Sequence, residues 1–275
     1  MSSDRFGGKT ALVTGAGGEI GAQSALRMAR EGASLVLFDR KEELLDGTRA
    51  ACEEAGAAVW TFGVDQTDRA RVDEAVAAAW EGAGRIDALF ANAGYGQFAP
   101  FLEISERAWH RHVDVNLSGT FHVCQATARQ MAGDEGGGAI VVSESSGAIV
   151  HSDQLLAYCT TKAALKMMVT GMAAELGTHR IRVNGIMPGV VETAMTGIAL
   201  GNPEHRDVLL SETPVGRLGK PDDVAALVCF LCSSEAAFIN GESISIDGGQ
   251  TVHGHPRWFR LDYRDAHEER WEIPR

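Results

Sequence analysis

Short aliphatic and β-branched segments alternate with longer segments of helical period, and this alternation constrains the fold more than any other feature. Most of the short segments are continuously apolar, as is typical of strands buried on both faces of a parallel sheet. The predicted strands are Thr10–Thr14, Ser34–Phe38, Ala58–Gly63, Ala88–Asn92, Ala139–Ser143, Arg182–Ile186 and Ser243–Ile246. The predicted helices are Ile20–Glu31, Lys41–Ala55, Arg69–Trp80, Ser105–Met131, Leu155–Leu176 and Pro221–Leu231. We therefore expect an α/β fold, a doubly wound parallel sheet of about seven strands with helices on both faces.

No Pro- or Ser-rich linker and no internal repeat divides the chain, so we expect a single domain over residues 1–253. Residues 192–211 are weakly periodic and precede the Thr213-Pro214 break, which is typical of a mobile lid or binding loop. Residues 254–275 carry clustered aromatic side chains among charges, which favours a tail docked on a surface.

The composition excludes several classes of function. The formal net charge of −12 would repel a nucleic-acid backbone and an anionic membrane surface. The polar N-terminus lacks a signal peptide's apolar stretch, and the apolar run Val224–Cys232 is about half of the ~18 residues of a membrane span. We expect a cytoplasmic protein without nucleic-acid or membrane partners. The five scattered cysteines, including the Cys229-x-x-Cys232 pair, are predicted to be reduced core residues rather than metal ligands.

A glycine-rich turn follows the first predicted strand and opens the first predicted helix, over Thr14–Gly21. Glycines at such a turn let a pyrophosphate approach the backbone, and the helix N-terminus favours the anion. Asp39, at the end of the second strand, lies near the spacing at which an acidic side chain meets the ribose hydroxyls of NAD. The alternative is a glycine turn that only caps an ordinary βαβ unit.

Tyr158 and Lys162 lie four residues apart in a predicted helix. This spacing puts both side chains on one face, where the ammonium can stabilise a tyrosinate and let the tyrosine act as a general acid or base. Ser145 lies thirteen residues before Tyr158, at the end of a buried strand. Ser143 and Ser146 compete with it for a catalytic role, and a serine there can also serve only to satisfy the backbone.

With these features the chain resembles a short-chain dehydrogenase/reductase over roughly residues 7 to 250. The matching motifs are the Thr14-Gly15 turn, Asp65, Asn92-Ala93-Gly94, Asn116, Ser145, Tyr158 with Lys162, Pro188-Gly189 followed by Thr193, and Asp247-Gly248-Gly249. The resemblance implies a Rossmann-like fold, a nicotinamide cofactor, a small-molecule substrate, no catalytic metal and a homotetramer. A tail crossing onto a neighbouring subunit near its substrate pocket is our hypothesis for residues 254–275.

The resemblance also implies roles for individual residues. Tyr158 exchanges a proton with the substrate oxygen, Ser145 positions that oxygen, Lys162 binds the nicotinamide ribose and lowers the tyrosine pKa, and Asn116 holds a relay water. Asp65 contacts the adenine, Asn92 the adenosine ribose side, and Val191 and Thr193 the carboxamide. The full cofactor-binding set is Gly15, Gly18, Glu19, Ile20, Gly21, Asp39, Arg40, Asp65, Gln66, Asn92, Ala93, Gly94, Tyr158, Lys162, Pro188, Gly189, Val191 and Thr193.

Glu19 departs from the family pattern, which has Gly or Ala at this position. We expect its side chain to turn to solvent; the alternative is weaker cofactor binding or an altered loop. Glu19 and Asp39 together oppose the 2′-phosphate of NADP by like-charge repulsion, so the sequence predicts NAD. Arg40 could nevertheless meet a phosphate.

The side chains predicted to line the substrate pocket are Tyr95, Gln97, His151, Gln154, Met195 and Ile198, each with a packing or surface role as its alternative. Their mixed polarity fits a cyclic, polyol, sugar-like or hydroxysteroid-like alcohol or ketone. The predicted activity is NAD-dependent oxidation of a secondary alcohol. The alternatives are an NADPH-dependent carbonyl reductase and a non-catalytic dinucleotide-binding regulator or scaffold, which would be expected to lack at least one of Asn116, Ser145, Tyr158 and Lys162.

Overall fold

The computed structural model describes residues 4–134 and 136–252, except the side chains of Ile198 and Ala199. The tail 254–275, with its predicted docking, lies outside the described residues. The strands are β1 Thr10–Thr14, β2 Ser34–Asp39, β3 Val59–Gly63, β4 Ala88–Ala91, β5 Gly138–Ser143, β6 Ile181–Pro188 and β7 Ser243–Ile246. The helices are α1 Glu19–Arg30, α2 Asp46–Glu54, α3 Arg69–Ala83, α4 Glu106–His112, α5 Thr120–Gly133, α6 Leu156–Leu176, α7 Gly197–Leu200, α8 Pro203–Ser211 and α9 Pro221–Cys232.

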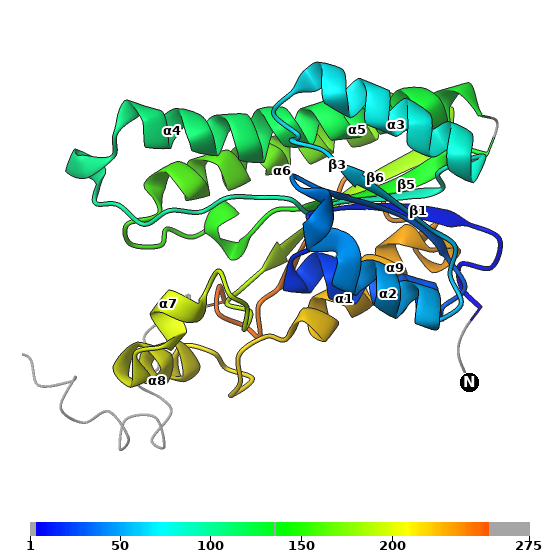
Figure 1. The fold of residues 1–275 in the computed structure, drawn as a ribbon. Coiled ribbons are helices and arrows are strands. Elements are labelled where there is room, and N and C mark those ends of the chain that lie inside the picture. The colour runs from blue at the N-terminus through cyan, green and yellow to red at the C-terminus, as the bar shows by residue number, and fades with distance from the viewer. Residues whose placement is uncertain (1–3, 135, 253–275) are drawn as a thin grey trace, which may run out of the picture.

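The seven strands form one parallel sheet in the order β3-β2-β1-β4-β5-β6-β7. Helices α1, α2 and α9 cover one face and α3 to α6 cover the other, so the strands are buried on both sides (Figure 1). Two apolar cores result. One joins β1 and β2 to α1 and α9 through side chains such as Met28 and Val228, and the other joins the sheet to α3, α5 and α6 through side chains such as Val76 and Val169. The predicted fold class is confirmed.

The chain reverses direction of travel across the sheet between β1 and β4, because β1 leads to β2 on one side while β4 and β5 lie on the other. In open parallel sheets this switch point leaves a crevice beyond the carboxyl ends of the strands. The glycine-rich turn that follows β1 and the Asn92-Ala93-Gly94 segment that follows β4 both lie at this point.

Three predicted elements differ from the structure. The helix predicted over Lys41–Ala55 is a 3-10 turn, Glu42–Leu45, followed by α2. The single helix predicted over Ser105–Met131 is present as three consecutive helical segments: α4, a π-helical segment over Val113–Gly119, and α5. The region 192–211, predicted as a loop, contains α7 and α8. Helix α8 begins at Pro203, and the side chain of the preceding Asn202 accepts a hydrogen bond from the Glu204 N–H at 2.9 Å, so it caps the helix.

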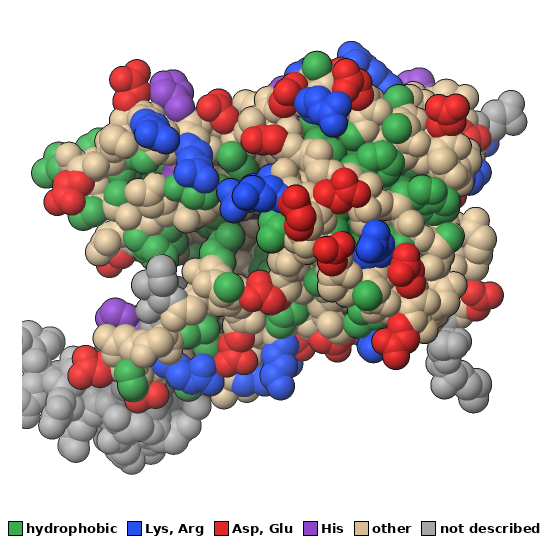
Figure 2. Space-filling view, in the orientation of Figure 1, with side chains coloured by type: hydrophobic (Ala, Val, Ile, Leu, Met, Phe, Trp, Pro, Cys, Tyr) green, Lys and Arg blue, Asp and Glu red, His purple; other side chains and the backbone are tan. Residues whose placement is uncertain are grey.

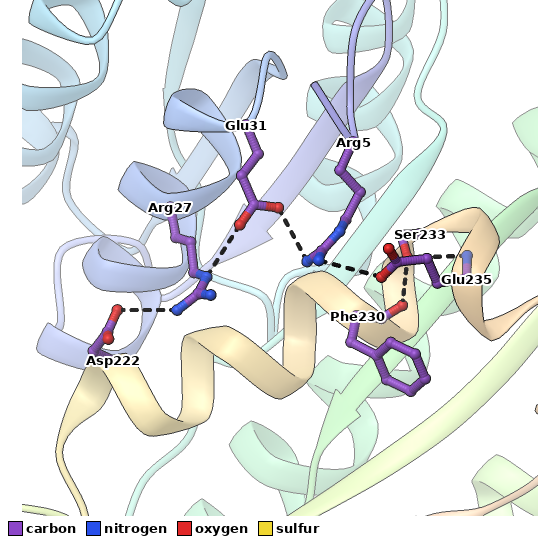
Figure 3. Close-up of polar contacts among 7 residues, drawn as sticks. All are labelled: Arg5, Arg27, Glu31, Asp222, Phe230, Ser233 and Glu235. Carbon is purple, nitrogen blue, oxygen red and sulfur yellow. Dashed lines mark hydrogen bonds and ion pairs between the residues drawn. The ribbon is translucent and has the colours of Figure 1, made fainter. Parts of the chain in front are cut away.

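A charged network fixes α1 against α9 and the N-terminal segment (Figure 3). The Glu31 carboxylate, which is 9% exposed, pairs with Arg5 at 3.1 Å and with Arg27 at 3.2 Å. Arg27 also reaches Asp222 at 3.4 Å, and Arg5 reaches Glu235 at 3.2 Å. The network therefore fixes α1, the helix that follows the glycine-rich turn. This helix lies on the face of the sheet opposite to α6 (Figure 1).

The cysteines are free: Cys52, Cys124, Cys229 and Cys232 are buried and Cys159 is half-buried. Burial raises the pKa of the Cys52 thiol to about 11, so this thiol stays protonated at neutral pH. Along residues 4–134 and 136–252, each helix is too short or too polar to cross a membrane.

Candidate active site

A cavity of about 980 Å³ lies beyond the carboxyl ends of the strands, at the switch point between β1 and β4. Figure 2 shows the surface hollowed between the α4 side of the molecule and the segment that carries α7 and α8. The cavity is lined by Ser145, Tyr158, Lys162 and the predicted cofactor-binding residues except Gly21. Residues that are far apart in the sequence and predicted for one site are therefore brought together.

The glycine-rich turn is shaped for close approach of a ligand to the backbone. Gly15 has φ +63°, and a Cβ built on it would lie 2.9 Å from the Ala93 Cα. A Cβ on Gly21 would overlap the Gly15 carbonyl oxygen, so Gly21 shapes the turn from behind without lining the cavity. Helix α1 starts after Gly18, which has no side chain to cap the first N–H groups. Uncapped donors at a helix N-terminus facing a cavity fit the pyrophosphate of a dinucleotide.

Thr14 and Asn92 tie the ends of β1 and β4 together. The Thr14 Oγ1 accepts hydrogen bonds from the N–H groups of Asn92 and Ala93, both at 3.0 Å. The Asn92 side chain donates to the carbonyl oxygens of Thr14 and Gly15 at 3.2 and 3.3 Å. These four hydrogen bonds hold the carboxyl ends of β1 and β4 together where the cavity lies.

Two aspartates lie at the carboxyl ends of neighbouring strands at one end of the cavity: Asp39 is the last residue of β2, and Asp65 follows β3. The Asp39 carboxylate accepts from the Gly17 N–H at 3.0 Å and from the Arg40 N–H at 2.8 Å. The Asp65 carboxylate accepts from the Thr67 N–H and hydroxyl at 2.9 and 2.8 Å. Acceptors at this end fit the ribose hydroxyls and the adenine of a dinucleotide.

Gln66, predicted to help bind the cofactor, has a buried side chain that lines the same end. Its amide donates to the carbonyl oxygens of Val115 at 2.8 Å and Ala93 at 3.3 Å. Gln66 therefore joins the segments that follow β3 and β4 to the π-helical segment, and it shapes the pocket wall.

Glu19 does more than turn to solvent. Its side chain is exposed, as expected, but the Oε1 atom accepts a hydrogen bond from the Ala194 N–H at 2.8 Å. The carboxylate thus links the glycine-rich turn to the segment that leads into α7. The neighbouring residues Thr193 and Met195 line the cavity, so this link crosses its wall.

Helix α6 presents Tyr158 and Lys162 to the cavity on one face, as the spacing predicts. The Lys162 ammonium is buried and donates to the Ser143 carbonyl oxygen at 2.6 Å. Its Nζ lies 5.6 Å from the centre of the Tyr158 ring. Ser145 follows β5 and caps the short turn Ser146–Ala148, its Oγ accepting from the Gly147 N–H at 3.1 Å.

The site perturbs both ionisable groups. Burial raises the pKa of Tyr158, and its hydrogen bond with the Ser145 side chain partly opposes that rise. Burial lowers the pKa of Lys162 to about 8. The two proton affinities thus move in opposite directions from the shared cause of desolvation. Perturbed groups that face each other in a cavity are typical of an acid–base site.

Asn116 lies in the π-helical segment and is buried. Its side chain donates to the Tyr95 carbonyl oxygen at 2.8 Å and to Thr161 Oγ1 at 3.1 Å, and it accepts from the Tyr95 N–H at 2.7 Å. A Cβ built on Gly94 would lie 3.5 Å from the Asn116 Oδ1 and 3.6 Å from the Lys162 Nζ. The side-chain oxygen of Asn116 and the ammonium of Lys162 therefore both lie close to Gly94.

The predicted substrate-pocket residues separate into two groups. Tyr95 and Met195 line the cavity. Gln97 accepts from the Tyr95 hydroxyl at 2.6 Å, His151 lies exposed 3.3 Å from Asp153, and Gln154 is exposed with φ 61°; none of these three lines it. Ile198 lies in α7, with its side chain outside what the structure describes.

Sequence reasoning missed four charged residues that line the cavity: Glu144, Arg107, Arg111 and Asp114. Glu144 was detectable as an acidic residue directly after an apolar strand. Arg111 lies over the Tyr95 ring, its Cζ 4.2 Å from the ring centre. The two arginines lie one turn apart on α4, a helical periodicity that places both on one face.

The chain is similar to known proteins over most of its length. A family described as Enoyl-(Acyl carrier protein) reductase matches residues 15–251. The chain is 40% identical to the D-threitol dehydrogenase of Mycolicibacterium smegmatis, covering 90% of this chain and 95% of that protein. It is 37% identical to the gluconate 5-dehydrogenase of Gluconobacter oxydans, covering 89% and 95%. An NAD⁺-bound xylitol dehydrogenase structure superposes with a TM-score of 0.86 at 32% identity, covering 89% of this chain and 100% of that one.

Proposed function

Since the chain belongs to the short-chain dehydrogenase/reductase family, we propose that it is an NAD-dependent dehydrogenase that oxidises a secondary alcohol of the polyol or sugar-alcohol class. The proposed activity is supported most directly by one observation. Tyr158, Lys162 and Ser145 converge on the cavity that the glycine-rich turn and the Asn92-Ala93-Gly94 segment also line. An acid–base pair beside a dinucleotide cradle is what hydride transfer from an alcohol needs.

The cavity residues provide the acid–base chemistry. A nicotinamide dinucleotide held in this cavity would supply the acceptor for the hydride of the carbinol carbon. The Tyr158 phenolate oxygen takes the proton of the substrate hydroxyl and becomes a hydroxyl, while Ser145 donates a hydrogen bond to the substrate oxygen and holds it in place. The Lys162 ammonium lowers the cost of forming the tyrosinate in a buried site. Asn116 holds the backbone of Tyr95 through hydrogen bonds to its N–H and carbonyl groups, close to Gly94 and Lys162.

NAD is favoured over NADP by the charges at the ribose end. The Asp39 carboxylate lies beside the glycine-rich turn, where it can accept hydrogen bonds from ribose hydroxyls and would repel a 2′-phosphate. Glu19 adds a second negative charge at the N-terminus of α1. Arg40 is the group that favours the NADPH-dependent alternative: it lines the cavity and is not ion-paired with any acidic residue that the structure describes.

The substrate class rests on the relatives, whose names describe dehydrogenases of D-threitol and gluconate, and on the cavity. Tyr95 and Met195 give that cavity both polar and apolar wall, which suits a chain or ring bearing several hydroxyls. We further propose that the enzyme is a cytoplasmic homotetramer with one domain over residues 1–253. A non-catalytic binding module is disfavoured because the set Asn116, Ser145, Tyr158 and Lys162 is complete.

The proposal is tested by following the near-ultraviolet absorbance of NADH or NADPH while the protein is incubated with C4 to C6 polyols, sugar acids, cyclic alcohols and hydroxysteroids. We expect NADH formation with at least one polyol and at least tenfold lower efficiency with NADP. Equal efficiency with NADP overturns the cofactor assignment. Measurable NAD binding without turnover of any substrate favours the binding module.

A further inference from the structure

Glu144 is a buried acidic residue inside the catalytic segment. It lies between Ser143, whose carbonyl oxygen accepts the hydrogen bond from Lys162, and Ser145. Its N–H donates to the Ile186 carbonyl oxygen at 2.9 Å, extending the β5–β6 ladder by one residue, and the residue is 2% exposed. Burying an ionised carboxyl group costs free energy unless a neighbouring opposite charge or hydrogen bonds compensate for the lost hydration.

The fold makes room for this carboxyl group. It lies against Gly185 of β6, where a Cβ would overlap the Glu144 Oε1 atom. That oxygen accepts a hydrogen bond from the Ser243 hydroxyl of β7 at 2.8 Å. The Oε2 atom is buried and has no hydrogen-bond partner among the residues that the structure describes. The carboxyl group is therefore held at one oxygen and left without a bond at the other.

Two lysines of α6, Lys162 and Lys166, act on the Glu144 carboxyl group through their charges, and Lys162 lines the same cavity as Glu144. The charges of Lys166 and Lys162 favour the ionised carboxyl group, although burial outweighs them and raises the pKa of Glu144 to about 7. The elements on its other sides, β6 and β7, face it with Gly185 and the uncharged hydroxyl of Ser243. The attraction also affects Lys162: burial lowers the pKa of Lys162, and the negative charge of Glu144 partly opposes that fall.

We propose that Glu144 is a positioning residue whose carboxylate is the counter-charge of the buried Lys162 ammonium, and so sets the protonation state in which Lys162 assists Tyr158. This inference rests on the proposed function for its catalytic consequence. Lys162 donates its described hydrogen bond to a carbonyl oxygen, which carries no net charge, so Glu144 supplies the balancing charge. Neither the glycine-rich turn nor the relay residue Asn116 can replace it.

The first test is the pH dependence of kcat for alcohol oxidation in Glu144→Gln, which keeps the size of the side chain and removes its charge. Lys162 loses its proton more readily in this variant, so we expect the alkaline limb to move to lower pH by about 0.5 to 1 unit. The control is Glu175→Gln, the same change at an exposed carboxylate on α6, and its limb stays in place. A uniform loss of kcat with both limbs unmoved assigns Glu144 a purely structural role and overturns the proposal.

A second measurement needs no turnover. The free energies of unfolding of wild type, Glu144→Gln, Lys162→Met and the double variant form a cycle that isolates the interaction of the two side chains. We expect clear non-additivity at about pH 7.5, where the carboxylate is populated, and its loss at about pH 5, where the carboxyl is protonated. Additivity at both pH values overturns the charge pair. A coupled cycle in a protein that oxidises no alcohol would instead refute the proposed function and leave the charge pair established.

Discussion

The Glu19 carboxylate accepts a hydrogen bond from the Ala194 N–H at 2.8 Å, joining two segments 175 positions apart at the wall of the candidate cofactor cavity. One segment is the glycine-rich turn and the other leads into α7. The contact uses a negative charge at the helix N-terminus where a pyrophosphate would bind. Glu19 therefore holds the cavity wall together and at the same time opposes the cofactor.

Replacing Glu19 by Gln removes the charge and retains the acceptor. We expect the dissociation constant of NAD to fall by about three- to tenfold at low salt, because a like charge beside the pyrophosphate is gone. Calorimetric titration at two salt concentrations checks this, and the gain shrinks as salt screens the charge. Glu19→Gly, which also breaks the link to Ala194, is the comparison. Weaker NAD binding in both variants would show that the carboxylate assists the cofactor.

Asp39 is predicted to set the choice of cofactor. In Asp39→Ser the repulsion of a 2′-phosphate is lost while Arg40 remains beside it, so we expect kcat/KM with NADP to rise about tenfold or more. Steady-state kinetics with both cofactors measure the change. Adding Arg40→Gln to this variant abolishes most of the gain. An unchanged preference in Asp39→Ser would place the selectivity elsewhere.

Glu31 is predicted to contribute most of the stability of the network between α1 and α9. Glu31→Ala leaves the guanidinium groups of Arg5 and Arg27 without the carboxylate between them, so we expect a loss of about 2 to 4 kcal/mol in the free energy of unfolding. Glu235→Ala removes an exposed partner of Arg5, and its loss stays below about 1 kcal/mol. Denaturant titrations of both variants check the order. Equal losses would contradict it.

The buried carboxyl group of Glu144 makes stability depend on pH with a defined sign. Its folded pKa of about 7 lies above its ordinary value of 4.5, so the fold favours the protonated form. The stability it contributes is present below about pH 4.5 and is lost as pH rises to about 7. We expect Glu144→Gln to gain on wild type by up to about 3 kcal/mol between pH 4.5 and 8. Thermal unfolding across this range measures it; a difference independent of pH would contradict the assignment.

The strands were predictable because each is an apolar run with few alternatives, and β1 begins and ends where the sequence places it. The cavity was predictable for the same reason, since parallel strands bring Gly15, Asn92 and Ser145 to one edge whatever the loops do. Helix α8 was missed although Asn202-Pro203 is a helix-start signal, because its helical face is only weakly apolar. The π-helical segment around Asn116 leaves the apolar period nearly unchanged, so periodicity could not reveal it.

Charges in the site were harder to place from sequence. The contact between Glu19 and Ala194 depends on how the segment after β6 folds back over the turn, which no local pattern encodes. The burial of Glu144 depends on the absence of a side chain at Gly185, on a neighbouring strand. Gln97, His151 and Gln154 stay predictions as substrate-binding residues, because position between Ser145 and Tyr158 or after Gly94 does not fix which way a loop side chain points.

In the proposed function Tyr158 performs acid–base chemistry on an alcohol beside bound NAD, and Tyr158→Phe tests this role most directly. The variant keeps the ring and removes the hydroxyl, so we expect NAD binding to stay within about threefold of wild type. We expect kcat for NADH formation from the best polyol of the panel to fall by about 10² to 10⁴. Retention of most of the wild-type kcat in Tyr158→Phe, with NAD binding intact, would contradict the account.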